Sequence, residues 1–404
     1  TARDDRPGLR CGTRRPAGNA AYQPQLLLND GSGRFTVAAP DTLPALPMSM
    51  GAVVTADFDR DGAPDLFLGA RVVPGRYPLP GRSALLLQRG GRFEDATDAI
   101  APDLREAGLV TAALGADVDG DGWTDLLVAC EWGGIRYWRN RDGTGFEERS
   151  APAGFAAAGT GLWSSLAEGE FNGDGRPDFV AGNLGLNTRY QATPERPAVA
   201  FHGAFSTGNV AQLVEARYAG DRLVPWRTRR ELASKIPAIL KRFPSNDVFA
   251  AASLGEILGE VRLAAAQRFA ATELRSGLFL SQADGTFRFE PLPRPAQISP
   301  AQALVARDLD GDGHRDLYVV HNSHAPDATI GHFTGGLSLL LRGDGRGGLR
   351  VVPAAESGLW VPGDGRGAVV LPGHPGSGGE VVIVARGGAP FLAFRRAAAA
   401  DHQR

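Results

Sequence analysis

The sequence predicts an all-β protein, a seven-bladed β-propeller of four-stranded antiparallel blades with a small helical insertion. Three observations carry this prediction. An acidic nine-residue loop occurs four times, an apolar strand follows every copy, and a hairpin with a Gly-containing turn recurs farther along the chain. A repeated unit of strand, loop, strand and hairpin is typical of propeller blades, which span about 40 to 50 residues each.

The acidic loops are the clearest repeat. Each places oxygen-bearing side chains at positions 1, 3, 5 and 9 and Gly at position 6, and the copies start at residues 57, 117, 170 and 308. A hard cation such as Ca²⁺ takes six to eight oxygen ligands, and a short loop can supply several only if the chain turns sharply at the Gly. We therefore predict structural calcium in three or four blades. The predicted ligands are Asp57, Asp59, Asp61, Asp65, Asp117, Asp119, Asp121, Asp125, Glu170, Asn172, Asp174, Asp178, Asp308, Asp310, Asp312 and Asp316.

Two other interpretations of these loops are weaker. An EF-hand needs a bidentate Glu at position 12 and flanking helices. Position 12 is instead an apolar residue of the following strand, namely Leu68, Val128, Ala181 or Val319. Solvated Asp-Gly turns without an ion are also disfavoured, because clustered carboxylates repel one another unless a cation neutralises them. The loop at 170 is the weakest candidate, since Asn172 carries no charge.

The strands follow from residue type and spacing. Small-residue segments such as SMGAVVTA precede the loops, apolar segments such as DLFLGA follow them, and hairpins such as LLLQRGGRF come next. An apolar strand, a turn containing Gly and a second strand form a strong hairpin signal. An N-terminal hairpin at 22–38 is expected to complete a seventh blade. The segment from Gly203 aligns with a loop and strand but lacks ligand residues, and residues 361–394 suggest a further blade without a full ligand set.

One segment departs from the β pattern. Thr228 and Ser253 each stand three residues before a Glu, which is the capping-box signature of a helix start. Apolar residues then recur at helical spacing, including Leu232, Ile236 and Ile239, and later Ile257 and Val261. We predict that residues 228–270 form a helical insertion within one blade of a single propeller domain that spans 1–404.

Composition and motifs exclude several function classes. The net charge of −2 gives no reason to expect a nucleic-acid partner, and no apolar run approaches the roughly 20 residues of a membrane span. Nucleophile-elbow, P-loop and dinucleotide-binding motifs are absent from the sequence. His314, His321, His324 and His332 are close in sequence but lack the accompanying ligand spacing of a zinc site, so we assign them no metal. No catalytic or cofactor-binding residue is assigned.

Tryptophans and cysteines are less informative. Trp132 and Trp163 flank the loop strands, where a propeller binds ligands, but packing between blades is the simpler interpretation. Cys11 and Cys130 could pair if the N-terminal segment folds back, and two separate thiols are favoured. The chain opens without an initiator Met or an apolar signal segment, so we expect a mature product or part of a longer polypeptide.

The loops and their following strands resemble the FG-GAP or VCBS repeats, the calcium-bearing blades also found in integrin α-subunit propellers. The resemblance covers roughly Leu26 to Phe394. Three further segments, RVVPGRYPLP at Arg71, GNLGLNTRYQAT at Gly182 and LKRFP at Leu240, are similar to bacterial secreted VCBS-repeat proteins related to the ASPIC/UnbV and cartilage acidic protein group. This resemblance implies that the sixteen residues named above act as ligands. No ASPIC/UnbV terminal domain is present in the sequence.

These observations lead to an expected function. We expect a calcium-stabilised binding or adhesion module, secreted, at the cell surface or in the periplasm, whose ligand is a protein or a carbohydrate and which is not catalytic. A propeller-based polysaccharide lyase or hydrolase is the competing class, and a purely structural segment of a larger surface protein is a third. A convergent group of Asp, Glu, His or Arg in the central channel would favour the enzyme. A flat aromatic face would favour binding.

Overall fold

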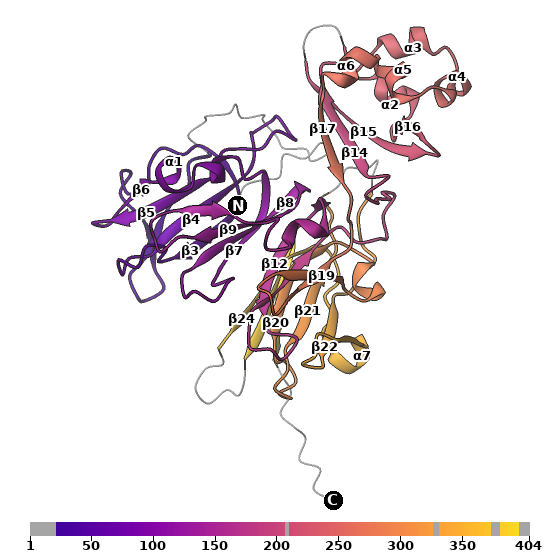
Figure 1. Ribbon diagram of the computed structural model, residues 1–404. Helices are drawn as coiled ribbons and strands as arrows, with labels where there is room; N and C mark the ends of the chain where they lie inside the picture. Colours follow the sequence, from indigo (N-terminus) through magenta and orange to yellow (C-terminus); the bar gives the residue numbers. More distant parts are fainter. Residues whose placement is uncertain (1–21, 207–209, 326–330, 373–379, 396–404) are drawn as a thin grey trace, which may run out of the picture. The chain divides into compact units, whose positions relative to one another are not determined.

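The computed structural model describes residues 22–206, 210–325, 331–372 and 380–395 (Figure 1). Cys11 and Gly208 lie outside these residues. The chain divides into two compact units. The blade unit comprises the residues up to Ala158, Leu162–Thr188 and the residues from Arg275 onward, and the inserted unit comprises Gly159–Gly161 and Arg189–Leu274.

Antiparallel sheets of repeated topology build the blade unit. Four of them share an arrangement of four strands in the order first, second, third, fourth, to which the second sheet adds a short fifth strand. The first sheet contains β3 (Ser49–Ala56), β4 (Asp65–Val72), β5 (Ala84–Arg89) and β6 (Arg92–Asp95), and the second contains β7 (Leu109–Ala116), β8 (Asp125–Gly133), β9 (Ile135–Asn140) and β10 (Phe146–Glu148). The third contains β12 (Ser165–Gly169), β13 (Asp178–Gly182), β18 (Gly277–Ser281) and β19 (Phe287–Pro291). The fourth contains β20 (Ala301–Arg307), β21 (Asp316–His321), β22 (Leu339–Gly343) and β23 (Leu349–Val352). The prediction of an all-β chain with antiparallel four-stranded sheets is confirmed.

Three more groups of strands complete the blade unit. A last sheet has three strands, β24 (Gly365–Leu371), β25 (Val381–Arg386) and β26 (Ala389–Arg395). The predicted N-terminal hairpin is present as β1 (Leu27–Asn29) and β2 (Phe35–Val37), a separate two-stranded sheet with exposed side chains. The fifth strand of the second sheet is β11 (Gly161–Leu162), which pairs with β8. Closure of seven blades into a ring stays a prediction.

The sheets pack in sequence order through their first strands. β3 contacts β7, β7 contacts β12, β12 contacts β20, and β20 contacts β24. Small residues make this spacing possible, because a Cβ on Gly51 would lie 1.8 Å from the carbonyl oxygen of Val110. Separate apolar cores fill the spaces between successive sheets, with Phe67 and Trp138 between the first two and Phe155 and Phe279 between the next two. The core is therefore a series of inter-sheet layers.

Short helical turns mark the crossovers from each sheet to the next. They are α1 (Thr97–Ile100) and the 3₁₀ turns η2 (Pro102–Glu106), η3 (Phe155–Ala158) and η4 (Arg294–Gln297), followed by α7 (Ala354–Ser357). Because antiparallel strands alternate in direction, each sheet has two distinct ends. The acidic loops and the third-to-fourth-strand turns lie at one end. The second-to-third-strand connections and the crossovers lie at the other.

Five short helices of the inserted unit lie within the segment for which the sequence predicts helices. They are α2 (Arg229–Ala233), α3 (Ala238–Arg242), α4 (Asn246–Ala251), α5 (Leu254–Leu258) and α6 (Glu260–Ala264). Both predicted capping boxes are present, at Thr228 and Ser253. Gly259, with φ of 92°, separates α5 from α6, so Val261 is 84% exposed although its spacing predicted a core position. The last residues of the predicted helical range form a strand instead.

That strand belongs to a sheet with the order β16-β15-β14-β17. Its members are β14 (Ala198–Gly203), β15 (Gln212–Ala219), β16 (Arg222–Pro225) and β17 (Gln267–Ala271). The helices pack on it through one core that includes Phe201, Val214 and Leu254. The segment from Gly203, interpreted from sequence as part of a blade in the array, thus joins β14 to β15 of the inserted unit. The chain leaves β13 to form this unit and returns at β18, which pairs with β13.

Candidate functional site

The four acidic loops share one backbone design built from their own side chains. The carboxylate or amide oxygen at position 3 accepts the backbone N–H of position 5, and that at position 5 accepts the N–H of position 7. Position 6 is Gly in each copy, with φ between 76° and 91°. Such short side-chain-to-backbone bonds are local, so the sequence alone can specify this turn.

The residue at position 9 fastens the loop to its sheet. Asp65, Asp125, Asp178 and Asp316 are at most 1% exposed. In each, Oδ2 accepts the backbone N–H of position 2 at 2.8 to 3.0 Å. The other oxygen, Oδ1, accepts an N–H at the end of the blade's third strand, at 2.6 to 3.1 Å. This carboxylate therefore closes the loop and also joins the second and third strands.

The inserted unit contains a neutral version of the same closure. Oε1 of Gln212 accepts the backbone N–H of Phe205 at 2.8 Å, seven residues earlier in the chain, as the position-9 Asp does elsewhere. Its Nε2 donates to Ser206. The alignment of this segment with a ligand-free loop therefore has a structural counterpart, because an amide can make the closing bond without any charge.

Burial shapes the protonation of the position-9 carboxyls. Burial raises the pKa of Asp125 to about 7, against bonds from backbone N–H groups that favour the charged form. The pKa values of Asp65, Asp178 and Asp316 are also raised, chiefly by burial. Carboxylates so placed are stabilised in their charged form by a nearby cation.

Three loops bring carboxylates together closely enough for one metal ion. Oxygen atoms of each group lie within 4.8 Å of one another, and the groups are Asp57, Asp59 and Asp61; Asp117, Asp119 and Asp125; and Asp308, Asp310 and Asp316. An all-oxygen donor set on a tight loop fits a hard cation such as Ca²⁺. The loop at 170 has an amide at position 3, and its Asp174 forms an ion pair with Arg176 at 2.7 Å. Burial acts to raise the pKa of Asp174, but hydrogen bonds from Arg176, Ser281 and Asn172 outweigh it and lower this pKa to about 2.

Arginines on the third strands enter three of the loops, a feature that the sequence interpretation missed. Arg89 binds Asp59 and, at 2.7 Å, Asp61. Arg139 binds Asp119 at 2.5 Å and Asp121 at 2.8 Å. Arg342 binds Asp310. An Arg at or near the end of the third strand in LLLQR, IRYWRN and LLLRG was the available sequence signal.

Neighbouring loops are also connected. Position 4 is Gly with φ of 77° to 81° in three loops, whereas Arg60 takes this place in the first loop with φ of 57°. The guanidinium of Arg60 lies 4.0 Å from the ring centroid of Trp123 and donates to the carbonyl of Gly122. Asn140 donates to the carbonyl of Phe58. Adjacent loops are therefore held together by side chains from both.

The opposite end of the blades carries the non-repeating residues. Arg71 at the end of β4 forms an ion pair with Glu131 of β8, and both are largely buried. Trp132, with φ of 56°, donates from its indole N–H to the Tyr77 hydroxyl at 2.8 Å. Two neighbouring second-to-third-strand connections are thus joined by side chains.

At the same end, Asn322 connects the fourth sheet to the crossovers that precede and follow it. This buried residue, with φ of 79°, donates to the carbonyls of Gly336 and Gly363 and accepts from Ser299. A Cβ on Gly335 would lie 2.9 Å from Nδ2 of Asn187, so this connection rests on the GNLGLN segment. Leu186, Ile298 and Leu337 expose 38 to 51% of their surface nearby.

The histidines and the tryptophans show mixed roles. Burial lowers the pKa of His321 to about 4, and its Nε2 lies 3.2 Å from the carbonyl oxygen of Ala296. His324 and His332 stack with ring centroids 4.7 Å apart. Trp163 is fully buried against Phe279 and Phe289, as packing between sheets predicts. Burial raises the pKa of Cys130 to about 12, so its thiol is poorly reactive.

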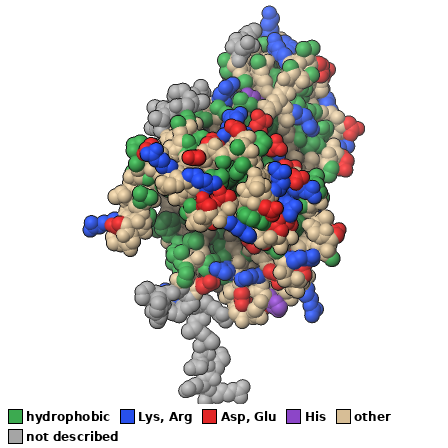
Figure 2. Space-filling view, turned by 60° about the vertical axis from the view of Figure 1, so that its left-hand side comes forward, with side chains coloured by type: hydrophobic (Ala, Val, Ile, Leu, Met, Phe, Trp, Pro, Cys, Tyr) green, Lys and Arg blue, Asp and Glu red, His purple; other side chains and the backbone are tan. Residues whose placement is uncertain are grey.

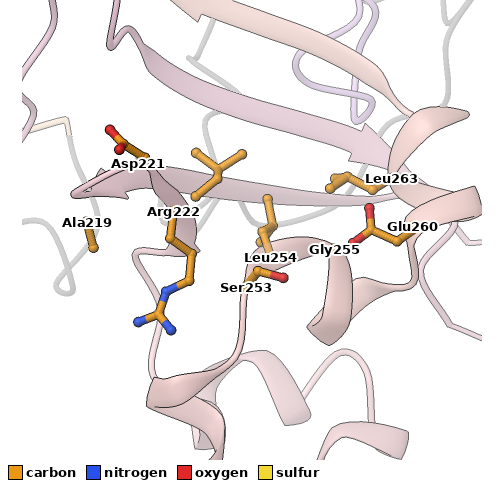
Figure 3. A pocket seen from close by; sticks show the side chains of 9 residues that line it. Ala219, Asp221, Arg222, Ser253, Leu254, Gly255, Glu260 and Leu263 are labelled. Carbon is orange, nitrogen blue, oxygen red and sulfur yellow. The ribbon is translucent and has the colours of Figure 1, made fainter.

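The inserted unit has a separate pocket of about 610 Å³ between β16 and the helices α5 and α6 (Figure 3). Leu223, Leu254 and Leu263 provide its apolar lining, and the Glu260 carboxylate lies beside Gly255. None of the predicted site residues lines this pocket. Among the described residues, no helix is long and apolar enough to cross a membrane.

Comparison with known proteins locates the repeats. The family model described as FG-GAP-like repeat matches residues 17–68 and 117–181. These segments include the loops at 57, 117 and 170 and the strands that follow them.

Solved structures give only distant similarity. The V. cholerae biofilm matrix protein Bap1 is 10% identical, with 91% of this chain and 70% of that chain covered and a TM-score of 0.31. The exotype rhamnogalacturonan lyase YesX is 14% identical, with 85% of this chain and 55% of the lyase covered and a TM-score of 0.32. These TM-scores are too low to establish a shared fold or function, and the narrower ASPIC/UnbV resemblance stays a prediction. The repeat match therefore identifies FG-GAP-like repeats within residues 17–68 and 117–181, a region of antiparallel strands.

Proposed function

We propose that this chain is a calcium-stabilised extracellular binding or adhesion module, and that it binds a protein or carbohydrate ligand through the end of its blades opposite the acidic loops. The observation that carries the proposal is the unequal composition of the two ends. One end repeats the same nine-residue loop in four sheets. The other end differs in every sheet and, in the third sheet, carries the whole inserted unit between β13 and β18. Repetition suits a scaffold, whereas ligand recognition resides on variable connections held by a rigid framework.

The proposed metal role is structural. The sixteen residues predicted from the sequence would supply oxygen ligands at the turn between the first and second strands. A bound cation would neutralise the loop carboxylates and hold each turn in shape. Loops of extracellular modules bind calcium with dissociation constants of roughly 0.1 to 1 mM, so such sites fill where calcium is plentiful.

The binding surface is proposed around three exposed apolar side chains, Leu186, Ile298 and Leu337. They come from the second-to-third-strand connections of the third and fourth sheets and from the crossover between these sheets. Exposed apolar residues gathered on a rigid support are typical of interaction sites. At this end, Arg71 and Glu131 form an ion pair with each other.

A ligand screen with matched variants tests the proposal. The protein would be screened in millimolar calcium against secreted-protein and glycan arrays. Replacement of Leu186, Ile298 and Leu337 by Ser should abolish binding to any ligand found. Val261→Ser, which removes an 84% exposed apolar side chain of the inserted unit, should leave it unchanged. Retained binding in the triple variant would place the ligand elsewhere and refute the assignment of this surface.

A further inference from the structure

Arginine side chains bind the carboxylates of the acidic loops. Three of the four receive a guanidinium from the third strand of the same sheet, and in each case it binds the carboxylates at position 3 or at positions 3 and 5. The Arg side chains are 39 to 41% exposed, so they reach the loop from its solvent side. Figure 2 shows acidic and basic side chains interspersed on one face of the molecule.

The positions of these arginines are regular. Arg139 and Arg342 each precede the residue whose N–H binds the position-9 Asp, namely Asn140 and Gly343. Arg89 follows the equivalent residue, Gln88, by one position. The third sheet differs, since buried Leu280 stands where Arg139 and Arg342 stand in their sheets. Its loop instead receives the hydroxyl of Ser281, which donates to Asp174 at 2.8 Å.

We propose that Arg89, Arg139 and Arg342 are built-in counter-cations that compete with the metal and set the calcium affinity of their loops. This inference rests on the proposed calcium binding. The oxygens at positions 3 and 5 are those that a metal ion on the loop would need. A guanidinium that occupies them must therefore move aside when the ion binds, and its positive charge then repels the ion. In the metal-free protein the same Arg relieves the repulsion between carboxylates and keeps the loop folded.

The competition has a definite sign. Removal of the Arg should tighten metal binding and destabilise the metal-free loop. From the usual contribution of exposed ion pairs, loss of two pairs should tighten binding by roughly two- to thirtyfold. A supporting Arg that merely orients the ligands would give the opposite result, because its removal would weaken binding.

The loop at 117 offers a site-specific measurement. Trp123 is position 7 of this loop and donates its backbone N–H to Asp121 at 2.9 Å. A terbium ion bound in the loop should therefore be sensitised by this indole, and calcium should displace it. Terbium and calcium titrations of the full chain would be compared for wild type, Arg139→Gln and Arg139→Lys. Arg149→Gln is the control, because Arg149 is in the same sheet region, 45% exposed, and pairs with Glu147.

Four results decide the matter. Tighter binding by Arg139→Gln, with a lower melting temperature in the absence of metal and wild-type behaviour of Arg149→Gln, supports the proposal. Binding by Arg139→Gln where wild type shows none also supports it. Equal or weaker binding by Arg139→Gln overturns it while leaving calcium binding intact. If neither protein binds either ion, the proposed calcium sites fail as well. Arg139→Lys, which keeps one positive charge without the two-pronged contact, should bind with intermediate affinity.

Discussion

In the metal-free protein, the buried carboxyl of Asp125 should reduce stability as the pH rises from about 4.5 to about 7. Burial raises the pKa of Asp125 from 3.8 to about 7. The folded protein therefore keeps a proton that the unfolded chain has already released in this interval. The stabilising contribution is fully present below the unfolded pKa and is lost as the pH rises through the folded pKa.

The size of the effect follows from the two pKa values. The full difference between 3.8 and about 7 corresponds to about 4 kcal/mol in the free energy of unfolding, of which about 3 kcal/mol falls between pH 4.5 and 7. Asp65, Asp178 and Asp316 change in the same direction because burial raises their pKa values too. The carboxylate of Asp174, with a pKa of about 2, acts in the opposite direction but only at lower pH. Burial lowers the pKa of His321 from 6.5 to about 4, which adds stability as the pH rises through the same interval. The difference between wild type and Asp125→Asn, and not the wild-type slope alone, therefore isolates the carboxyl.

Urea unfolding followed by tryptophan fluorescence measures this directly. Wild type, Asp125→Asn and the exposed control Asp103→Asn would be compared without metal and in millimolar calcium across the interval. We expect the free energy of unfolding of Asp125→Asn to fall less, or to rise more, with pH than that of wild type. Asp103→Asn should behave as wild type. Calcium should also flatten the slope, since a nearby cation favours the charged carboxylate. The same change in stability across the interval in wild type and in Asp125→Asn would refute the reasoning.

Three further outcomes are expected. Calcium at ten times its dissociation constant should add about 1.4 kcal/mol of stability for each occupied loop, visible as a higher melting temperature than in EDTA, and identical melting curves would contradict it. Phe155→Ala should cost about 3 to 5 kcal/mol in urea unfolding, because this fully buried ring packs against Tyr137, Phe279 and Phe287 between two sheets; a loss below about 1 kcal/mol would argue against that packing. Replacement of 189–274 by a Gly-Ser linker should leave a soluble β-type protein because β13 and β18 pair without it, whereas replacement of 228–270 alone should give an insoluble product because it uncovers the core at Phe201 and Val214. Circular dichroism and solubility measurements check this last pair, and the reverse outcome would mean that the helices are dispensable for the inserted sheet.

Local chemistry explains what could be predicted from the sequence. The loops at 57, 117, 170 and 308, the strand after each and the capping boxes at 228 and 253 depend on bonds between residues two to eight positions apart. A short stretch of sequence is therefore enough to predict each of these features. The hairpins were equally accessible, since an apolar strand followed by a Gly-containing turn specifies its own partner.

The parts that could not be predicted involve residues far apart in the chain. Arg89 lies 30 residues from Asp59, and Arg71 lies 60 from Glu131, so no local pattern pairs them. The segment from Gly203 resembles a blade locally, yet β17 pairs with β14 and the unit is separate from the array. Its strand pattern is the same in either setting, and only the choice of neighbour differs.

The sequence by itself determined the repeated loops, their strands and the oxygen donors that each loop could offer a cation, because these depend on the order of residues within a few turns of chain. Only the tertiary structure decided which sheets pack together, that β13 pairs with β18 across the inserted unit, and that an arginine enters three of the loops. The physical reason is that packing and ion pairing depend on distance in space. Sheet stacking brings together side chains that lie tens of residues apart.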